Sequence, residues 1–310
     1  MAAAKPSSAE AAMAGIPNIH SLTTCIMDAV RFIVVGVGGN GLYIHDHLAR
    51  TIGGLEKNFQ ERASLIAVDF DTFEPKNLGR QRCIPADIGR NKAEVATMRA
   101  QRAYNLPDEC LSFWPEKITC GNDVIDFMLP RAHNIFIDCL DKTTPRKHIH
   151  DAIIRYSKGI EVVSMYVISA GNGEWGGQVI MGGVTKKGEG ICLGQKGRKA
   201  TDPAYNFSIP LPYDLYPALT DVKADEKEEA LSCADRLVEN IQTLAVNVTA
   251  STLAYNYANC ILADFVGNTQ REMGLTTAGV EFDAFDNQFR HTSLTDEYLY
   301  RVDMKAIYGE

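Results

Sequence analysis

The chain is predicted to fold as an α/β domain built on a doubly wound, mostly parallel sheet. Three observations predict this fold class. The apolar run at 32–35 ends in a glycine-rich turn and passes into an amphipathic stretch, which is the order strand, turn, helix. Two further apolar runs, at 64–68 and 134–137, each end at an aspartate. Short buried strands that alternate with helical stretches are typical of a Rossmann-like sheet with helices on both faces.

The glycine-rich turn predicts a phosphate site. It contains Gly36, Gly38, Gly39 and Gly41, with Asn40 before the last of them. Glycine is needed where the backbone turns tightly and approaches a phosphate, while the free amides and the positive end of the next helix face the anion. Dinucleotide-dependent oxidoreductases share this spacing, and a purely structural turn can also produce it. The turn alone therefore leaves the class of nucleotide open.

The polar loop after the second strand adds side chains that suit a nucleotide. Asp69 ends the strand, and a carboxylate in that place can hold a ribose hydroxyl. Asp71, Asn77, Arg80 and Gln81 follow within the same loop. Arg80 offers the planar fork that matches phosphate oxygens. A dehydrogenase would need little more than the aspartate, so the loop favours another kind of nucleotide chemistry.

Lys92 opens the next helical stretch and is predicted to add a second positive charge. If its side chain points back over the sheet edge, the charge lies where the β and γ groups of a triphosphate would sit. The alternative is that Arg80, Arg82, Arg90 and Lys92 form only a solvated basic run, because charged runs are usually on the surface.

The third strand predicts a metal ligand. Asp138 and Asp141 follow it, at the carboxyl edge where open parallel sheets bind their ligands. Asp141 is the better placed of the two to hold Mg²⁺ against phosphates, and Asp138 is the weaker candidate. Asp141 could instead cap the helix that is expected to begin near Thr144.

Together these residues resemble the adenylation site of the ThiF/MoeB/ubiquitin-activating-enzyme (E1) superfamily. The family pattern reads here as Gly36 to Gly41, Asp69, Asn77 to Gln81, Lys92 and Asp141. The run DTFEPKNLGRQRCIPADIGRNKAEV is most similar to short ThiF-like proteins of bacterial plasmids and mobile elements, the PRTRC type. The resemblance is firm from 31 to 160, weaker from 231 to the C-terminus and poor between them.

The resemblance implies an E1-like enzyme that uses ATP and Mg²⁺ to adenylate the C-terminal glycine of a ubiquitin-like β-grasp protein. Arg80 and Lys92 would be catalytic, since such a site works by positioning and charge neutralisation and needs no general base. The resemblance also implies a homodimer, with an E2-like protein as a further partner where a thioester is transferred. Cysteines without obvious pairing, in a sequence where no signal peptide is evident, predict a cytoplasmic protein with reduced thiols. The alternatives are a non-catalytic scaffold that binds a ubiquitin-like protein, and an adenylyltransferase for a sulfur carrier or a small molecule.

The cysteines bear on the fate of the adenylate. The chain has 8 of them and no CxxC pair, so the zinc site of many relatives is not expected. Cys233 precedes a long helical stretch, 236–265, and resembles the family's loop cysteine; a helix N-terminus favours its thiolate, which predicts a thioester there. It could equally be a buried structural cysteine. Cys192, in the glycine-rich segment 188–197, is the second candidate.

Two features depart from the family pattern. Many relatives have an N-terminal arginine that reaches the partner's ATP, but no arginine precedes Arg31 here. Lys142 follows Asp141 where many relatives have asparagine, which bears on the metal geometry.

Composition narrows the classes of function. The 31 basic and 39 acidic residues give a net charge of −8, which argues against general nucleic-acid binding. No run is apolar enough to span a membrane, because Asn247, Asn256 and Asn259 interrupt the longest one. A nicotinamide-dependent oxidoreductase is disfavoured because no hydride-transfer constellation is evident.

The chain is long enough for one large domain with an appendage. We expect a flexible N-terminal segment at 1–25, the ATP-binding adenylation half at 26–183, a crossover loop inserted at 184–232, and a long helix with closing strands at 233–310. The last segment alternates and turns at Asp286, which predicts a C-terminal hairpin.

Overall fold

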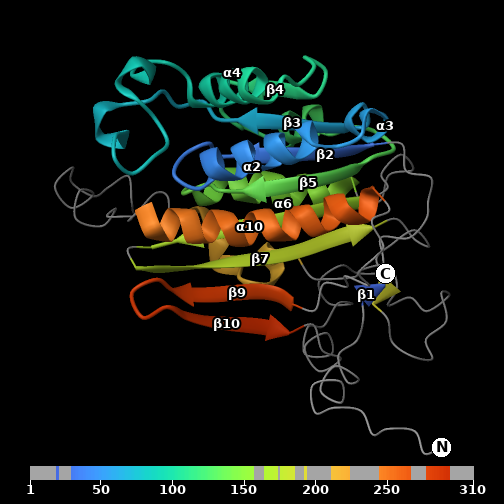
Figure 1. Cartoon of the computed structure of the whole chain (residues 1–310). Helices are drawn as coiled ribbons and strands as arrows, with labels where there is room; N and C mark the ends of the chain where they lie inside the picture. The colour runs from blue at the N-terminus through green and yellow to red at the C-terminus, as the bar shows by residue number, and fades with distance from the viewer. Residues whose placement is uncertain are drawn as a thin grey trace, which may run out of the picture.

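The computed structural model describes residues 19–20, 29–156, 164–173, 175–185, 192–193, 211–223, 244–266 and 277–293. Their main feature is an eight-stranded sheet with the order β10-β9-β7-β6-β5-β2-β3-β4 (Figure 1). The five strands from β6 to β4 run parallel to one another, and β7, β9 and β10 are antiparallel to their neighbours. The predicted fold class, a mostly parallel α/β sheet, is confirmed.

The strands of this sheet are β2 (Val30–Val35), β3 (Ala63–Val68), β4 (Leu111–Trp114), β5 (His133–Asp138), β6 (Ser164–Asn172), β7 (Gly176–Thr185), β9 (Thr277–Asp283) and β10 (Gln288–Ser293). The central strands are almost continuously apolar because helices cover both of their faces. Two short strands, β1 (Ile19–His20) and β8 (Cys192–Leu193), pair separately.

The longer helices are α2 (Gly41–Gly53), α4 (Lys92–Tyr104), α5 (Gly121–Asp126), α6 (Thr143–Tyr156) and α10 (Leu244–Phe265). Alternate residues of β2 divide the core between them. Phe32 and Val34 pack with residues of α2 and α10 in one cluster, whereas Ile33 and Val35 pack with α5 and α6 in another. Figure 1 shows α2 and α10 across the near face of the sheet, with α6 behind it.

This topology places a switch point beside β2. The chain leaves β2 through α2 to β3 on one side, and β5 pairs with β2 on the other. The loops that follow β2 and β5 therefore lead away from each other. In open α/β sheets, ligands bind between two such loops, at the carboxyl ends of the strands.

The short elements lie mainly in the connections: α3 (Lys57–Gln60), η1 (Pro75–Asn77), η2 (Pro85–Asp87), α7 (Pro212–Leu215) and η4 (Pro217–Thr220). The last two lie within the expected crossover segment, 184–232, and form where Pro212 and Pro217 set the backbone angle that opens a helical turn. The hairpin of β9 and β10 is as predicted. None of the described helices combines the length and the apolar composition needed to cross a membrane.

Several predictions concern residues outside the described ranges. The segment 1–25 is described only at Ile19 and His20, and the first part of the long helix, 236–243, is not described. The boundaries of the four expected segments stay predictions.

Gly183 offers a test of the sheet packing. It lies opposite Tyr166, whose ring is fully buried, and a Cβ at Gly183 would come within 2.2 Å of that ring. We expect Gly183→Ala to lower the free energy of unfolding by about 1–3 kcal/mol, because the ring has no free space to move into. Gly173→Ala is the matched control, since its Cβ would meet no atom closer than 3.9 Å. Urea denaturation measures both, and equal stabilities would refute this account of Gly183.

Candidate functional site

The glycine-rich turn lies at the switch point and is packed against the end of β5. Gly36 has a φ of +85°, which favours glycine, and a Cβ there would lie 2.6 Å from the carbonyl oxygen of Cys139. Its own N–H donates to Val68 O at 2.9 Å. A Cβ on Gly41 would lie 2.0 Å from Gly36 O. The first and last glycines are thus required by the protein's own packing.

The middle of the turn presents free backbone donors. The N–H groups of residues 38–41 donate to no other described residue. They stand at the N-terminus of α2, where the helix dipole adds partial positive charge. Successive free amides at a helix start form a site for a phosphate group. The residues present therefore fit a bound nucleotide phosphate.

Asp69 joins this turn to the loop after β3. Its carboxylate accepts hydrogen bonds from Val37 N at 2.6 Å and from Asp71 N at 2.8 Å. Burial raises its pKa to about 6, and the ammonium of Lys92 opposes that rise. Asp69 is thus fixed beside the glycine turn, with the lone pairs that a ribose hydroxyl would need.

Lys92 is buried, and it does not belong to a solvated surface run. Its side chain is 10% exposed, and Nζ lies 3.0 Å from Asp71 Oδ2. Arg82 and Arg90, by contrast, are exposed and pair with Asp46 and Glu94 on the surface. The alternative of a solvated run therefore describes the two arginines but not the lysine.

Asn91 is a contributor that the sequence patterns missed. Its Nδ2 donates to the carbonyl oxygens of Asp69 at 2.9 Å and Asp71 at 3.2 Å, while its Oδ1 caps α4 by accepting from Glu94 N. An asparagine directly before a helix is a recognisable capping signal. What the signal does not show is that the same side chain also fixes the loop that carries Asp69.

The 77–81 loop approaches the turn from the other side. Asn77 is buried and closes its own helical turn by accepting from Glu74 N at 2.9 Å, which is a structural role. Gln81 is buried, and its Oε1 has no hydrogen-bond partner among the described residues. The amide nitrogen of Gln81 lies 3.7 Å from the place of a Cβ on Gly38, so this side chain lies against the glycine turn, with its unpaired oxygen enclosed by the protein.

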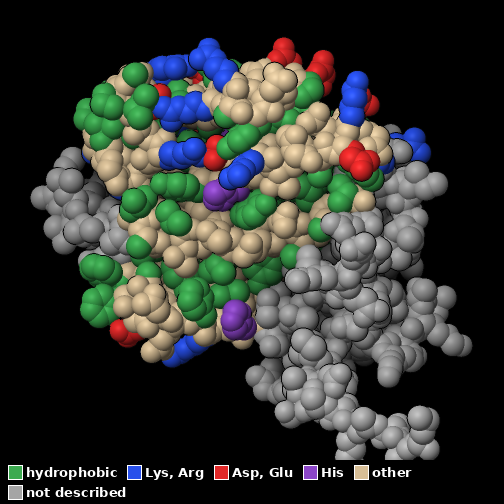
Figure 2. Space-filling view, viewed as in Figure 1, with side chains coloured by type: hydrophobic (Ala, Val, Ile, Leu, Met, Phe, Trp, Pro, Cys, Tyr) green, Lys and Arg blue, Asp and Glu red, His purple; other side chains and the backbone are tan. Residues whose placement is uncertain are grey.

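Arg80 and Lys92 place their charges in the same region. Burial raises the pKa of the nearby Cys83 thiol, and the charges of Arg99, Lys92 and Arg80 oppose that rise. Arg80 forms no ion pair within the described part of the chain. Figure 2 shows Lys and Arg side chains gathered over α2, α4 and the loop before α4. Arg80 therefore brings a basic side chain without an ion-pair partner among the described residues to the neighbourhood of Lys92.

The two aspartates after β5 have different surroundings. Asp138 is fully buried and accepts bonds from Ser169 Oγ at 3.0 Å and Tyr213 OH at 3.2 Å, besides an ion pair with Arg146 at 3.0 Å. Burial and the charge of Asp138 raise the pKa of Tyr213 well above its usual value, so the phenol stays a donor. Asp141 is exposed at the same edge.

This difference bears on Mg²⁺. Among the described residues, no group of three or more His, Cys, Asp and Glu side chains could hold a metal ion. Mg²⁺ commonly takes only one or two carboxylates from a protein and completes its shell with water and phosphates. Asp141 is accessible for such a role, and Asp138 is occupied by its partners.

The proposed nucleophiles remain undescribed. Cys233 lies outside the described residues, and Cys192 lies in β8, where the surroundings of its side chain are not described. Cys139 borders the glycine turn, but burial raises its pKa far above the usual value, so its thiol is unreactive.

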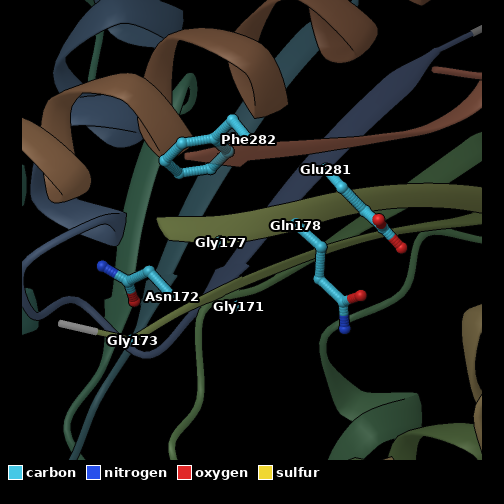
Figure 3. Close-up of a pocket in the computed structure, with 7 residues that line it drawn as sticks. All are labelled: Gly171, Asn172, Gly173, Gly177, Gln178, Glu281 and Phe282. Atoms are coloured by element: carbon cyan, nitrogen blue, oxygen red, sulfur yellow. The ribbon is translucent and has the colours of Figure 1, made fainter. Parts of the chain in front are cut away.

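A hollow of about 480 Å³ lies at the ends of β6 and β7 (Figure 3). It is lined by Gly171, Asn172, Gly173, Gly177, Gln178, Glu281 and Phe282. In Figure 3, Gln178 and Glu281 point to the same side, Phe282 points to the opposite side, and Asn172 points away from both.

A switch-point crevice with free amides, a strand-end carboxylate and two basic residues defines an α/β nucleotide-binding protein. The profile of the ThiF family matches residues 13–297, which is nearly the whole chain. The chain therefore belongs to the ThiF family, and the resemblance inferred from the sequence is confirmed.

Solved structures agree on the fold. Escherichia coli MccB, solved with ATP, superposes with a TM-score of 0.53 at 16% identity, covering 87% of this chain and 65% of MccB. PaaA superposes with a TM-score of 0.53 at 14% identity, covering 86% of this chain and 74% of PaaA. The chain thus spans about two thirds of the length of MccB. No curated protein matches it significantly in sequence.

Asp69 predicts a pH dependence of stability. Its folded pKa, about 6, lies above the ordinary 3.8, so its contribution to the free energy of unfolding is fully present below pH 3.8 and is lost as the pH rises through about 6. The loss amounts to about 3 kcal/mol at 1.36 kcal/mol per pKa unit. We expect the stability of the wild type relative to Asp69→Asn to fall across this range in urea denaturation. A difference that stays constant with pH would contradict the raised pKa.

The strand-end aspartates predict effects of very different size on stability. Asp138→Ala should lower the free energy of unfolding by about 3–5 kcal/mol, because it leaves the buried Arg146 without its partner. Asp141→Ala should change it by less than about 0.5 kcal/mol, because this side chain is exposed. Denaturation curves of both variants test this, and a large effect of Asp141→Ala would show that it too is structural.

Proposed function

We propose that this protein is an ATP-dependent adenylyltransferase that activates the C-terminal carboxylate of a ubiquitin-like β-grasp protein. The observation that carries the proposal is the convergence at the switch point of the free amides of residues 38–41, the fixed carboxylate of Asp69 and the buried ammonium of Lys92. ThiF family membership supports the reaction class.

ATP fits this arrangement as a substrate. Asp69 would accept a hydrogen bond from a ribose hydroxyl, and the amides of the turn would bind phosphate oxygens at the start of α2. Arg80 and Lys92 would contact the β and γ groups. Mg²⁺, held by Asp141 and the phosphates, would supply further charge neutralisation.

The chemistry needs positioning more than proton transfer. A carboxylate oxygen of the protein substrate forms a bond to the α-phosphorus while the bond to the bridging oxygen breaks, and pyrophosphate leaves with that electron pair. The products are an acyl adenylate and pyrophosphate. Arg80 and Lys92 would stabilise the charge that develops on the leaving group, and the turn would hold the α-phosphate for in-line attack.

The activated carboxylate must belong to a second ligand that is bound together with ATP. MccB, whose fold is similar, has been solved with ATP and in complex with N-formylated MccA, so a protein of this fold binds a second molecule besides the nucleotide. We further propose a homodimer, and capture of the acyl group as a thioester on Cys233 before transfer to an E2-like protein. A sulfur carrier, a small molecule and a non-catalytic scaffold are the alternative outcomes.

The proposal is tested by exchange of labelled pyrophosphate into ATP in the presence of a cognate β-grasp protein. We expect exchange that depends on the terminal glycine and falls about 100-fold in Arg80→Ala, because one preorganised charge stabilising a transition state has about this effect. Arg90→Ala is the matched control, since Arg90 is an exposed arginine paired with Glu94 away from the turn. It should keep the wild-type rate.

The same reaction on a non-reducing gel addresses the cysteine. A thiol-sensitive adduct that is lost only in Cys233→Ala supports the thioester, and loss only in Cys192→Ala moves that role to Cys192. Exchange without an adduct means adenylation alone. If ATP binds but no exchange occurs with any β-grasp protein, sulfur carrier, peptide or small-molecule carboxylate, the enzymatic proposal is wrong and the scaffold remains.

A further inference from the structure

Three asparagines from distant parts of the chain meet beneath the glycine turn. We call Asn40, Asn172 and Asn247 the asparagine cluster; they come from the start of α2, the end of β6 and the first turns of α10. Asn40 and Asn247 are buried, and Asn172 is partly buried. Buried amides are costly unless they are hydrogen-bonded, so their partners show what the cluster holds together.

The amides form a continuous chain of hydrogen bonds. Asn40 and Asn172 bond reciprocally through their side chains, with both contacts at 3.2 Å. Asn172 Nδ2 also donates to Asn247 Oδ1. Ser251, one turn further along α10, donates from Oγ to the carbonyl oxygen of Asn40 at 3.0 Å. The helix is therefore bonded to Asn40 directly through Ser251, and Asn247 is linked to Asn40 through Asn172.

The far end of this chain reaches the loop that carries Arg80. Asn247 Nδ2 donates to Arg80 O at 3.2 Å. A hydrogen bond to the main chain of a residue fixes where its side chain starts, and Arg80 itself has no ion-pair partner among the described residues. The backbone contact is therefore a restraint on where the guanidinium can reach.

The amide of Asn247 also fills the space behind the turn. A Cβ on Gly39 would lie 2.6 Å from Asn247 Nδ2 and 2.9 Å from its Cγ. The φ of Gly39 is not in the left-handed region, so alanine is excluded there by Asn247 and not by the backbone. One side chain thus lies against Gly39 of the turn and donates to the loop that carries Arg80.

We infer that Asn247 is a positioning residue that sets the distance between the phosphate turn and Arg80. The inference rests on the proposed function, because it assigns Arg80 to the β and γ groups of ATP. It predicts that loss of the Asn247 side chain weakens binding of the β and γ phosphates. Contacts to adenosine and to the α-phosphate should be unaffected. A purely structural asparagine would weaken ATP and AMP binding equally.

The experiment measures the dissociation constants of Mg·ATP and AMP by calorimetry for the wild type, Arg80→Ala and Asn247→Ala. We expect both variants to bind ATP about tenfold more weakly and to keep AMP affinity close to the wild-type value, since tenfold corresponds to the loss of about one hydrogen bond to a charged group. Asn256→Ala, an exposed asparagine on the same helix, is the matched control and should keep both affinities.

A double-mutant cycle tests the contact itself and remains informative if one variant is unstable. Gly39→Ala pushes Asn247 out of place, so it should weaken ATP binding on its own. In the double variant Gly39→Ala/Asn247→Ala the obstructing amide is gone, so the ATP affinity should equal that of Asn247→Ala alone. If the two losses multiply, the residues act independently and the inference is wrong.

The outcomes separate this inference from the proposed function. If the wild type does not bind ATP, or if Arg80→Ala lowers ATP and AMP affinity alike, the proposed role of the site fails. If Arg80→Ala lowers only ATP affinity but Asn247→Ala lowers both equally, the site stands and Asn247 is merely structural.

Discussion

The site depends on one constraint: a turn that offers its backbone amides to a phosphate cannot use those amides to hold itself in place. The N–H groups of residues 38–41 are free of described partners, so the turn is fixed by contacts at its other groups. The N–H of Gly36 donates to the carbonyl oxygen of Val68 at the end of β3. The carboxylate of Asp69 accepts from Val37 N, and the hydroxyl of Ser251 donates to Asn40 O. Preorganisation of this kind is what allows fixed dipoles to stabilise charge without rearranging during a reaction.

The same logic separates two kinds of carboxylate at the sheet edge. Asp138 is surrounded by Arg146, Ser169 and Tyr213, and its other oxygen accepts from Leu140 N at 3.0 Å, so it holds the backbone of the loop that leads to Asp141. Removing one member of a buried ion pair strongly destabilises the fold, because the other charge stays buried without a partner. The residue that shapes the loop is therefore inside, and the residue free to contact a ligand is outside.

The sequence predicted the parts of the site that are local. The turn, Asp69 and Lys92 lie within some sixty residues, and each follows a strand or opens a helix, so their meeting at one edge follows from parallel topology alone. Asn172 and Asn247 could not be predicted, because their contact depends on how α10 crosses β6. In the sequence, Asn247 was visible only as an interruption of an apolar run. Nothing local distinguishes it from Asn256, which the fold leaves exposed.

The positions of the turn therefore require glycine for different reasons. Position 36 requires glycine because φ is positive and Cys139 O lies 2.6 Å from where a Cβ would be. Position 39 requires glycine because the side chain of Asn247 fills the space that a Cβ would occupy. At Gly38 only Gln81 comes near, at ordinary contact distance, so that position faces the crevice. The glycine motif thus combines a backbone requirement at Gly36, a packing requirement at Gly39 and an open position at Gly38. The first two fix the position of the turn relative to β5 and α10, and the third leaves space beside its backbone.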